Sequence, residues 1–262
     1  MSDWLHNLPV PGMALVVFGL TYLLAAAIYA GVVALAGGGR AKSFKAITPG
    51  ILPSLGIIFG LFVAFTAAQV WGDNERASAA VSREASALRS AVILAGSFPA
   101  EPEARLRSLV RSYIDEAAAE EWPLMARQAA SLKATPRALA EALQFVLALP
   151  TTTSGQQTAQ REITSALETA LDARRQRIIV SRAEVNFVKW LCLYLQAATV
   201  LLAIALLQCD DRLAAAAAMG LFATGVAASV LLIAAHDRPF TGQISVTPEP
   251  LLQVMPDVPA KN

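Results

Sequence analysis

Four long stretches of this chain contain no Asp, Glu, Lys or Arg, and they constrain its fold more than any other feature. They cover Val10–Gly39, Ala46–Gly72, Trp190–Cys209 and Leu213–Ala235. A helix needs about 20 apolar residues to cross the hydrocarbon core of a bilayer, so each stretch is long enough or nearly so. The sequence therefore predicts four membrane-spanning helices.

The composition agrees with this prediction and excludes several classes of function. The chain is 55% hydrophobic and only 16% charged, whereas soluble domains contain about 25% charged residues. Its net charge of +1 gives no electrostatic footprint for nucleic acid. Two cysteines and two histidines are too few for a metal cage. We expect the lipid bilayer as a partner, and no nucleic acid, metal or cofactor.

The four spans form two pairs with a long polar segment between them. This order predicts an all-α membrane protein with four transmembrane helices in two hairpins and an inserted helical bundle domain. The predicted regions are a first transmembrane hairpin (1–72), a water-exposed helical domain (73–186), a second hairpin (187–236) and an extended C-terminal tail (237–262).

The polar segment has the periodicity of amphipathic helices. No helix-breaking residue follows the second span, and apolar residues recur every three or four positions up to about Ser97, which predicts one uninterrupted helix. Further helices are predicted over 102–121 and 136–149, each close to a proline that favours a first turn. The last polar helix begins near Gln156 and is expected to pass without a break into the third span. Asp211 is expected to cap the fourth span.

The side of the membrane that holds the central domain stays open. Gly37–Gly39 is expected to end the first span, and the loop after it carries Arg40, Lys42 and Lys45 with no acid. The positive-inside rule then favours a cytoplasmic loop and an external domain. The arginines that flank the central domain favour the opposite orientation.

Polar side chains inside a span are informative because an unpaired one is costly in lipid. In the second span Phe59, Phe62, Thr66 and Gln69 follow one another at spacings of 3, 4 and 3. Around the axis of an oligomer this face is expected to line a pore, with an aromatic constriction that opens into a polar vestibule. The alternative is that the aromatic rings pack on the first span and that the polar side chains bond a neighbouring helix.

Small and aromatic residues in the spans suggest packing and anchoring sites. Gly56 and Gly60 form a GxxxG pattern, which allows another helix to approach closely. Trp71 and Trp190 are expected to lie at the same membrane surface as interface anchors. No Asp, Glu, Lys or Arg lies deep in a span, which argues against an ion-coupled transporter but not against a passive pore.

The tail begins with a compact polar motif, Asp237, Arg238, Pro239 and Phe240. Next to His236 the first two residues have the types of an acid–base cluster. The simpler interpretation is that they cap the helix end and pair with the domain or with lipid head groups. No Ser/His/Asp set, HExxH, GxSxG or Walker pattern occurs, so we do not expect an enzyme.

Four segments resemble a known family. They are GIIFGLFVAFTAAQVW at Gly56–Trp71, the helical segments REASALRS at Arg83–Ser90 and RLRSLVRSYIDEAAAEEWPLMA at Arg105–Ala126, and the tail DRPFTGQISVTPEP at Asp237–Pro250. Together they resemble bacterial membrane proteins described as having a bestrophin-like domain. The tail and the EEWP segment are the most specific parts.

The resemblance implies a function as well as a fold. Bestrophins are homopentameric anion channels lined by their second helix, so the implied protein is a multi-pass, self-associating ion channel of the bacterial inner membrane. Phe59, Phe62, Thr66 and Gln69 would then form its neck. The rival hypothesis is a non-conducting membrane sensor or scaffold whose helical domain docks partners.

Overall fold

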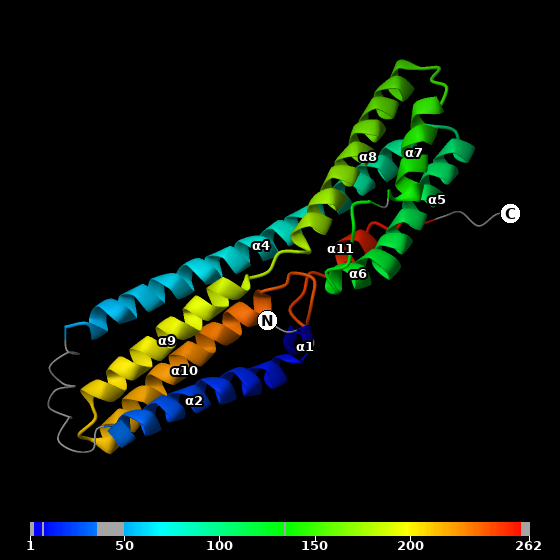
Figure 1. The fold of residues 1–262 in the computed structure, drawn as a ribbon. Helices are drawn as coiled ribbons and strands as arrows, with labels where there is room; N and C mark the ends of the chain where they lie inside the picture. The colour runs from blue at the N-terminus through cyan, green and yellow to red at the C-terminus, as the bar shows by residue number, and fades with distance from the viewer. Residues whose placement is uncertain (1–2, 7, 36–49, 134, 258–262) are drawn as a thin grey trace. The chain divides into compact units, whose positions relative to one another are not determined.

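The computed structural model describes residues 3–6, 8–35, 50–133 and 135–257, and within these ranges the chain is helical with no strand (Figure 1). The predicted all-α fold class is confirmed. The expected helix stop at Gly37–Gly39 and the basic loop after it lie outside the described residues.

The chain divides into two compact units. The membrane unit contains Met1–Gly72, Glu184–Asp237 and Gly242–Ile244, and the polar unit contains the remaining segments, chiefly Asp73–Ala183.

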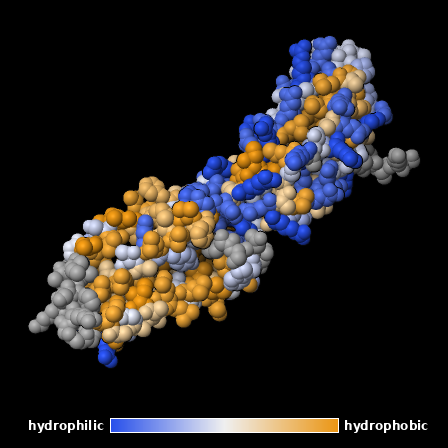
Figure 2. All heavy atoms as spheres, viewed as in Figure 1, coloured by the Kyte–Doolittle hydropathy of each residue, from blue (hydrophilic) through white to orange (hydrophobic). Residues whose placement is uncertain are grey.

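The membrane unit holds the four predicted spans. They are α2 (Val10–Leu35), the first part of α4 (Leu52–Ala95), α9 (Phe187–Leu207) and α10 (Arg212–His236), preceded by the short α1 (Asp3–His6). Each of the four is long and apolar enough to cross a bilayer, which confirms the predicted number of spans. α2 packs on α10 and on α9, the last two spans in the chain. Large apolar side chains cover the outside of these helices (Figure 2), as expected where the surrounding medium is hydrocarbon.

Several hydroxyl groups in the spans bond to their own helices. Thr21, Thr199 and Ser229 each donate to the carbonyl four residues earlier, at 2.8 to 2.9 Å. This local bond satisfies the hydroxyl without a partner helix. At the start of α10, Asp211 accepts from the backbone N–H groups of Leu213 and Ala214, both at 3.0 Å, so the predicted cap is confirmed.

α4 is one uninterrupted helix of 44 residues that contributes to both units. This confirms the prediction that the second span continues as a polar helix. It ends three residues before Phe98-Pro99, where the proline ring disfavours further helix.

The polar unit is a helical bundle with its own apolar core. It consists of the second part of α4 with α5 (Ala100–Glu116), η1 (Ala117–Glu121), α6 (Trp122–Ala126), α7 (Arg137–Ala148), α8 (Ser154–Val180) and α11 (Glu249–Leu252). Its core contains fully buried side chains from these helices: Val81, Leu88, Ile114, Leu139, Ile163 and Leu167.

The helix predicted over 102–121 differs from the observed one in its last turn. α5 ends at Glu116, and η1 is a π-helical turn in which the N–H of Trp122 donates to the carbonyl of Ala117. Pro123 has no N–H, so a regular α-helical bond to residue 119 cannot form there. A wider turn accommodates the proline and changes the direction of the side chains that precede it.

The prediction that α8 passes without a break into the third span is wrong. α8 ends at Val180, and α9 starts at Phe187 after Asn186, whose side chain accepts from the N–H of Lys189 at 2.9 Å. The intervening chain is fixed by a tertiary bond, from the N–H of Val185 to the carboxylate of Asp237 at 2.6 Å. A contact between residues so distant in the sequence leaves no local signal.

The segment after α10 was expected to be extended, and it is only partly so. It contains α11, whose Leu251 is fully buried in the core of the polar unit. The guanidinium of Arg111 also donates to the carbonyl of Pro256 at 3.1 Å.

Candidate functional site

The four residues predicted to line a pore lie on the covered side of α4. Phe59 is 8% exposed, and its ring packs on Phe222 of α10 with centroids 5.5 Å apart. Thr66 is buried and donates to the carbonyl of Phe62 at 2.8 Å, and Phe62 is half-buried in the same apolar cluster. Gln69 accepts a hydrogen bond from the ammonium of Lys189. Within one chain these side chains therefore contact α10 and α9, and their role as pore-lining residues stays a prediction.

The opposite side of α4 carries a different row of side chains that the sequence analysis did not single out. Ile57, Leu61 and Phe65 are 71%, 55% and 68% exposed. Their spacing of four residues places them on one side of the helix, one above the other. The sequence does contain this i, i+4, i+8 row of large apolar residues. The covered side of the helix is apolar too, so the pattern alone does not distinguish the exposed side from the covered side.

Gly56 and Gly60 are open on the side where a second helix would approach. A Cβ at either position would meet nothing within 4 Å. Gly60 precedes Leu61 by one residue and therefore lies about 100° around the helix from it. Within the described residues nothing lies that close to either glycine, so the close approach that the pair permits is not used inside this chain.

The two tryptophans predicted as interface anchors have different surroundings. Trp71 is half exposed. Trp190 is buried in the apolar cluster of the membrane unit, where it stacks on Tyr194 with centroids 6.4 Å apart. Of these two residues, Trp71 is the one that presents its indole to the outside of this chain.

The first residue of the tail motif, Asp237, bonds to two segments of the membrane unit that are distant from it in the sequence. Asp237 is the C-terminal cap residue of α10 and is 2% exposed. One carboxylate oxygen lies 3.2 Å from Nε2 of His6, and the other accepts from the N–H of Val185. The interpretation of Asp237 as a structural residue agrees with these partners.

The next residues of the motif belong to the polar unit. The ring of Phe240 meets that of Trp122 edge-on at 5.8 Å, and the carbonyl of Pro239 accepts from the N–H of Val246 at 2.8 Å. Trp122 in turn donates its indole N–H to the carbonyl of Val246 at 3.0 Å. Arg238 is 7% exposed. The EEWP and tail segments, quoted separately in the sequence, are thus neighbours in the fold.

A buried charge cluster lies in the polar unit, and the sequence analysis missed it. Glu84 of α4 and Arg177 of α8 are both fully buried, and Nε of Arg177 donates to Oε2 of Glu84 at 2.7 Å. Arg177 also donates to Glu121 at 2.9 Å, and its guanidinium lies 4.5 Å from the ring centre of Trp122. Nε of Arg174 donates to the same Glu121 at 2.8 Å.

Two groups in the cluster, Tyr113 and Arg177, have a raised pKa. Tyr113 donates its hydroxyl to Glu84, and burial, followed by the adjacent carboxylate, raises the pKa of this tyrosine well above its ordinary value. Burial alone would lower the pKa of Arg177, but the charge and hydrogen bonds of Glu84 outweigh it and raise the pKa. The cluster therefore joins α4, α5, η1 and α8 through buried ion pairs and the hydroxyl of Tyr113.

Comparison with known proteins decides the family. A model of the bestrophin-like domain matches residues 19–251. This chain belongs to the bestrophin-like family. A comparison with curated proteins finds no match.

Solved structures share the fold of this bestrophin-like chain. A variant of a bacterial bestrophin homologue from Klebsiella pneumoniae superimposes with a TM-score of 0.69 at 13% identity, covering 92% of this chain and 97% of the homologue. A second variant of that homologue gives 0.62 at 15% identity, covering 92% and 96%. A variant of a protein described as a membrane protein gives 0.66 at 16% identity, covering 92% and 95%. At these identities the likeness establishes the bestrophin-like fold and leaves the residues of the site to be argued from this chain.

Clusters of possible metal ligands were sought among the described residues. Among the described residues, no group of three or more His, Cys, Asp or Glu side chains has an arrangement that would hold a metal ion.

Proposed function

We propose that this protein is a homo-oligomeric passive ion channel of the bacterial inner membrane, whose pore is lined by α4. The observation that carries the proposal is the exposed row Ile57, Leu61 and Phe65. Three large apolar side chains on one side of a helix form a hydrophobic constriction when several copies surround an axis, and such a constriction gates by dewetting.

α4 is also the span that the chain itself covers least. In the most apolar window of each span, 17% of the residues of α4 are buried, against 22% in α2, 33% in α10 and 44% in α9. A helix at the edge of one subunit is available to its neighbours in an oligomer. The open glycine pair, about a quarter turn from Leu61, gives a neighbouring α4 room to pack beside the proposed pore row.

This choice of face differs from the one expected from the sequence. Phe59 packs on Phe222 of α10, and Thr66 bonds to a carbonyl of α4 itself. Both side chains therefore lie on the side of α4 that faces its own subunit. The exposed row is free to face an axis without unpacking the subunit.

We propose anions as the permeant ions because the chain belongs to the bestrophin-like family and bestrophins are anion channels.

The test is anion flux from proteoliposomes that contain the purified protein, together with the mass of the detergent-solubilised complex. We expect a ring of several copies. Phe65→Ala should change the rate of flux several-fold, because it removes an aromatic side chain from the constriction. Phe59→Ala should lower thermal stability and leave the flux per folded complex within about twofold, since a buried Phe→Ala change costs about 3–5 kcal/mol through packing.

The matched control for the exposed row is Leu221→Ala on α10, where the leucine is as exposed as Phe65 but lies on a different span. It should leave the flux unchanged. A monomeric complex, or a flux that responds to Phe59→Ala and not to Phe65→Ala, would contradict the proposed pore face. The absence of flux in a folded oligomer would favour the non-conducting sensor or scaffold.

A further inference from the structure

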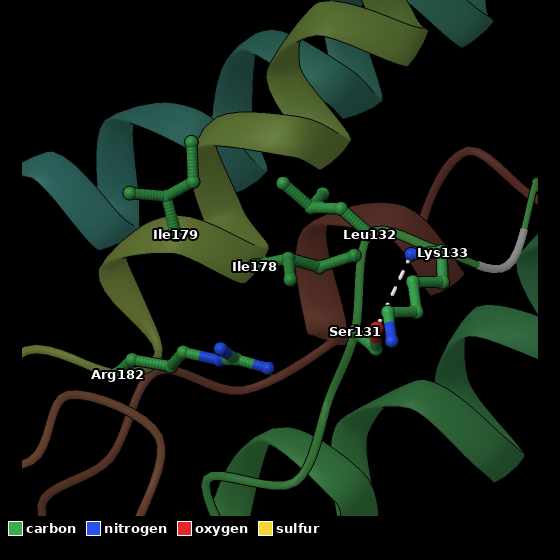
Figure 3. A pocket seen from close by; sticks show the side chains of 6 residues that line it. All are labelled: Ser131, Leu132, Lys133, Ile178, Ile179 and Arg182. Carbon is green, nitrogen blue, oxygen red and sulfur yellow. Dashed lines mark hydrogen bonds between the residues drawn. The ribbon is translucent and has the colours of Figure 1, made fainter.

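A pocket of about 440 Å³ opens in the polar unit between the end of α8 and the loop that follows α6 (Figure 3). This size lies in the range of small-molecule sites. Its walls come from six side chains: Ser131, Leu132, Lys133, Ile178, Ile179 and Arg182.

The loop reaches the pocket because α6 ends in a tight, well-bonded turn. Gln128 has a φ of 56°, in the left-handed region, and its N–H donates to the carbonyl of Met125 at 2.9 Å. The N–H of Ala129 donates to the carbonyl of Leu124 at 2.8 Å. These two bonds form a Schellman motif, which reverses the chain after a helix. The turn leads the chain into Ser131–Lys133, so this wall of the pocket has a defined backbone.

The charged groups of the pocket are both positive. Arg182 donates to the carbonyl of Ala130 at 2.6 Å, and this bond holds its guanidinium across the opening toward the loop (Figure 3). Within the described ranges, Lys133 and Arg182 form no ion pair, and the six lining residues include no acid. The hydroxyl of Ser131 accepts from the N–H of Lys133 at 3.2 Å, which leaves the hydroxyl hydrogen available for a ligand.

The helix end beside these cations does not offset their charge. The C-terminus of a helix carries partial negative charge on unbonded carbonyls. Here the carbonyl of Ile178 accepts from the hydroxyl of Ser181 at 2.8 Å, and that of Ile179 accepts from the N–H of Arg182 at 3.3 Å. The carbonyl of Val180 accepts from the N–H of Ala183 at 2.9 Å. The last turn of α8 is thus bonded internally, and the pocket stays electropositive.

The rest of the pocket is apolar. Ile178 is almost fully buried beneath it, and Leu132 and Ile179 stand half exposed at its sides. We propose that this pocket binds an amphiphilic anion, a phosphate or carboxylate group attached to an apolar chain. Arg182, Lys133 and Ser131 would hold the oxyanion through charge-assisted hydrogen bonds, while the two isoleucines and Leu132 contact the chain. This inference is independent of whether the protein conducts ions.

Such an anion has two sources, a membrane phospholipid or a water-soluble acyl or alkyl phosphate. The test measures binding to the purified full-length protein in neutral detergent by titration calorimetry. The probes are dioctanoyl phosphatidylglycerol, octyl phosphate, inorganic phosphate and, as the zwitterionic control, dioctanoyl phosphatidylcholine. We expect at least one anionic amphiphile to bind tenfold or more tightly than either inorganic phosphate or phosphatidylcholine. A preference for phosphatidylglycerol identifies the lipid source, and a preference for octyl phosphate identifies the soluble one.

Two substitutions locate the binding. Arg182→Gln and Lys133→Gln should each weaken binding of the preferred probe about tenfold. Lys133 is exposed and unpaired within the described ranges, so its variant should keep the thermal stability of the wild type. Arg175→Gln, which removes an exposed charge from the same helix outside the pocket, is the matched control and should bind as the wild type does. Equal binding by the wild type and Lys133→Gln, or equal affinity for inorganic phosphate and the amphiphiles, would overturn the proposal.

Discussion

The two parts of α4 carry buried polar side chains that are satisfied in different ways. In the membrane unit, the buried Thr66 bonds to a carbonyl of its own helix. In the polar unit, the buried Glu84 bonds to Arg177, which is 93 residues away in the sequence. The first solution is local and needs no partner, whereas the second exists only when the bundle is assembled.

The comparison shows which buried polar groups depend on the assembled fold. A span whose polar groups are satisfied internally is stable as a helix before it packs, and it leaves its outer surface free for lipid or for another subunit. A buried carboxylate in the polar unit is stable only with its ion-pair partners in place. Changes at the charge cluster should therefore have larger effects than changes at polar groups within the spans.

The largest effect is expected from Arg177→Met. This substitution leaves Glu84 buried without its cation, which costs about 3–5 kcal/mol of the free energy of unfolding. Pulse proteolysis across a denaturant series measures the loss in the polar unit.

The exposed Arg175→Met is the matched control and should shift the free energy of unfolding by less than about 0.5 kcal/mol. The double variant Glu84→Gln/Arg177→Met should recover a large part of the stability, since neither charge is then left alone. The single variant Glu84→Gln completes the cycle. A loss in the double variant as large as the sum of the losses in Arg177→Met and Glu84→Gln would show that the ion pair is not the origin of the effect.

An intermediate effect is expected from Tyr113→Phe, which removes the hydroxyl that donates to Glu84. Hydrogen bonds to charged groups contribute about 1.5–3 kcal/mol. The pKa of Tyr113 is raised in the folded state, so the folded protein keeps this proton when the unfolded chain has lost it. Its contribution is complete below about pH 10, the ordinary tyrosine pKa, and is lost as pH rises above that value.

Thermal unfolding of both proteins between pH 8 and pH 11 measures this contribution. The difference in stability between the wild type and Tyr113→Phe should narrow above about pH 10. A difference that stays constant over the whole range would mean that the hydroxyl does not titrate as this contact requires.

The smallest effect is expected from Thr66→Val in the span. Its hydroxyl bonds only to the carbonyl of Phe62 among the described residues, and polar contacts inside membrane helices average about 0.6 kcal/mol. Unfolding in detergent should therefore change by less than about 1 kcal/mol, and the oligomer should keep its mass. If Thr66→Val lowered the free energy of unfolding as much as Tyr113→Phe does, the proposed difference between the buried polar groups of the two parts of α4 would be wrong.

The sequence was sufficient for features that depend on one segment at a time. Spans follow from length and charge, the long α4 follows from periodicity, and the cap at Asp211 follows from one side chain next to a helix start. Features that need two distant segments were not predictable. Glu84 and Arg177 each have the appearance of a solvated surface residue, and the end of α8 depends on the contact between Val185 and Asp237.

The sequence could not predict which side of α4 is exposed, for a different reason. Ile57, Leu61 and Phe65 on one side and Phe59 and Phe62 on the other are all apolar, so the contrast that orients a helix in water is missing in lipid. Thr66 and Gln69 indicated a special side, but that side faces the subunit's own helices. Only the neighbours of α4 in space distinguish the two sides.

The pairing of the first span with the last two has a consequence for biosynthesis. His6 meets Asp237 231 residues later in the chain, and α2 packs on α9 and α10. At about 5–20 residues per second, a ribosome takes on the order of 10 to 50 seconds to make that intervening chain. For most of its translation the nascent chain therefore carries a first span whose packing partners α9 and α10 have not yet been made.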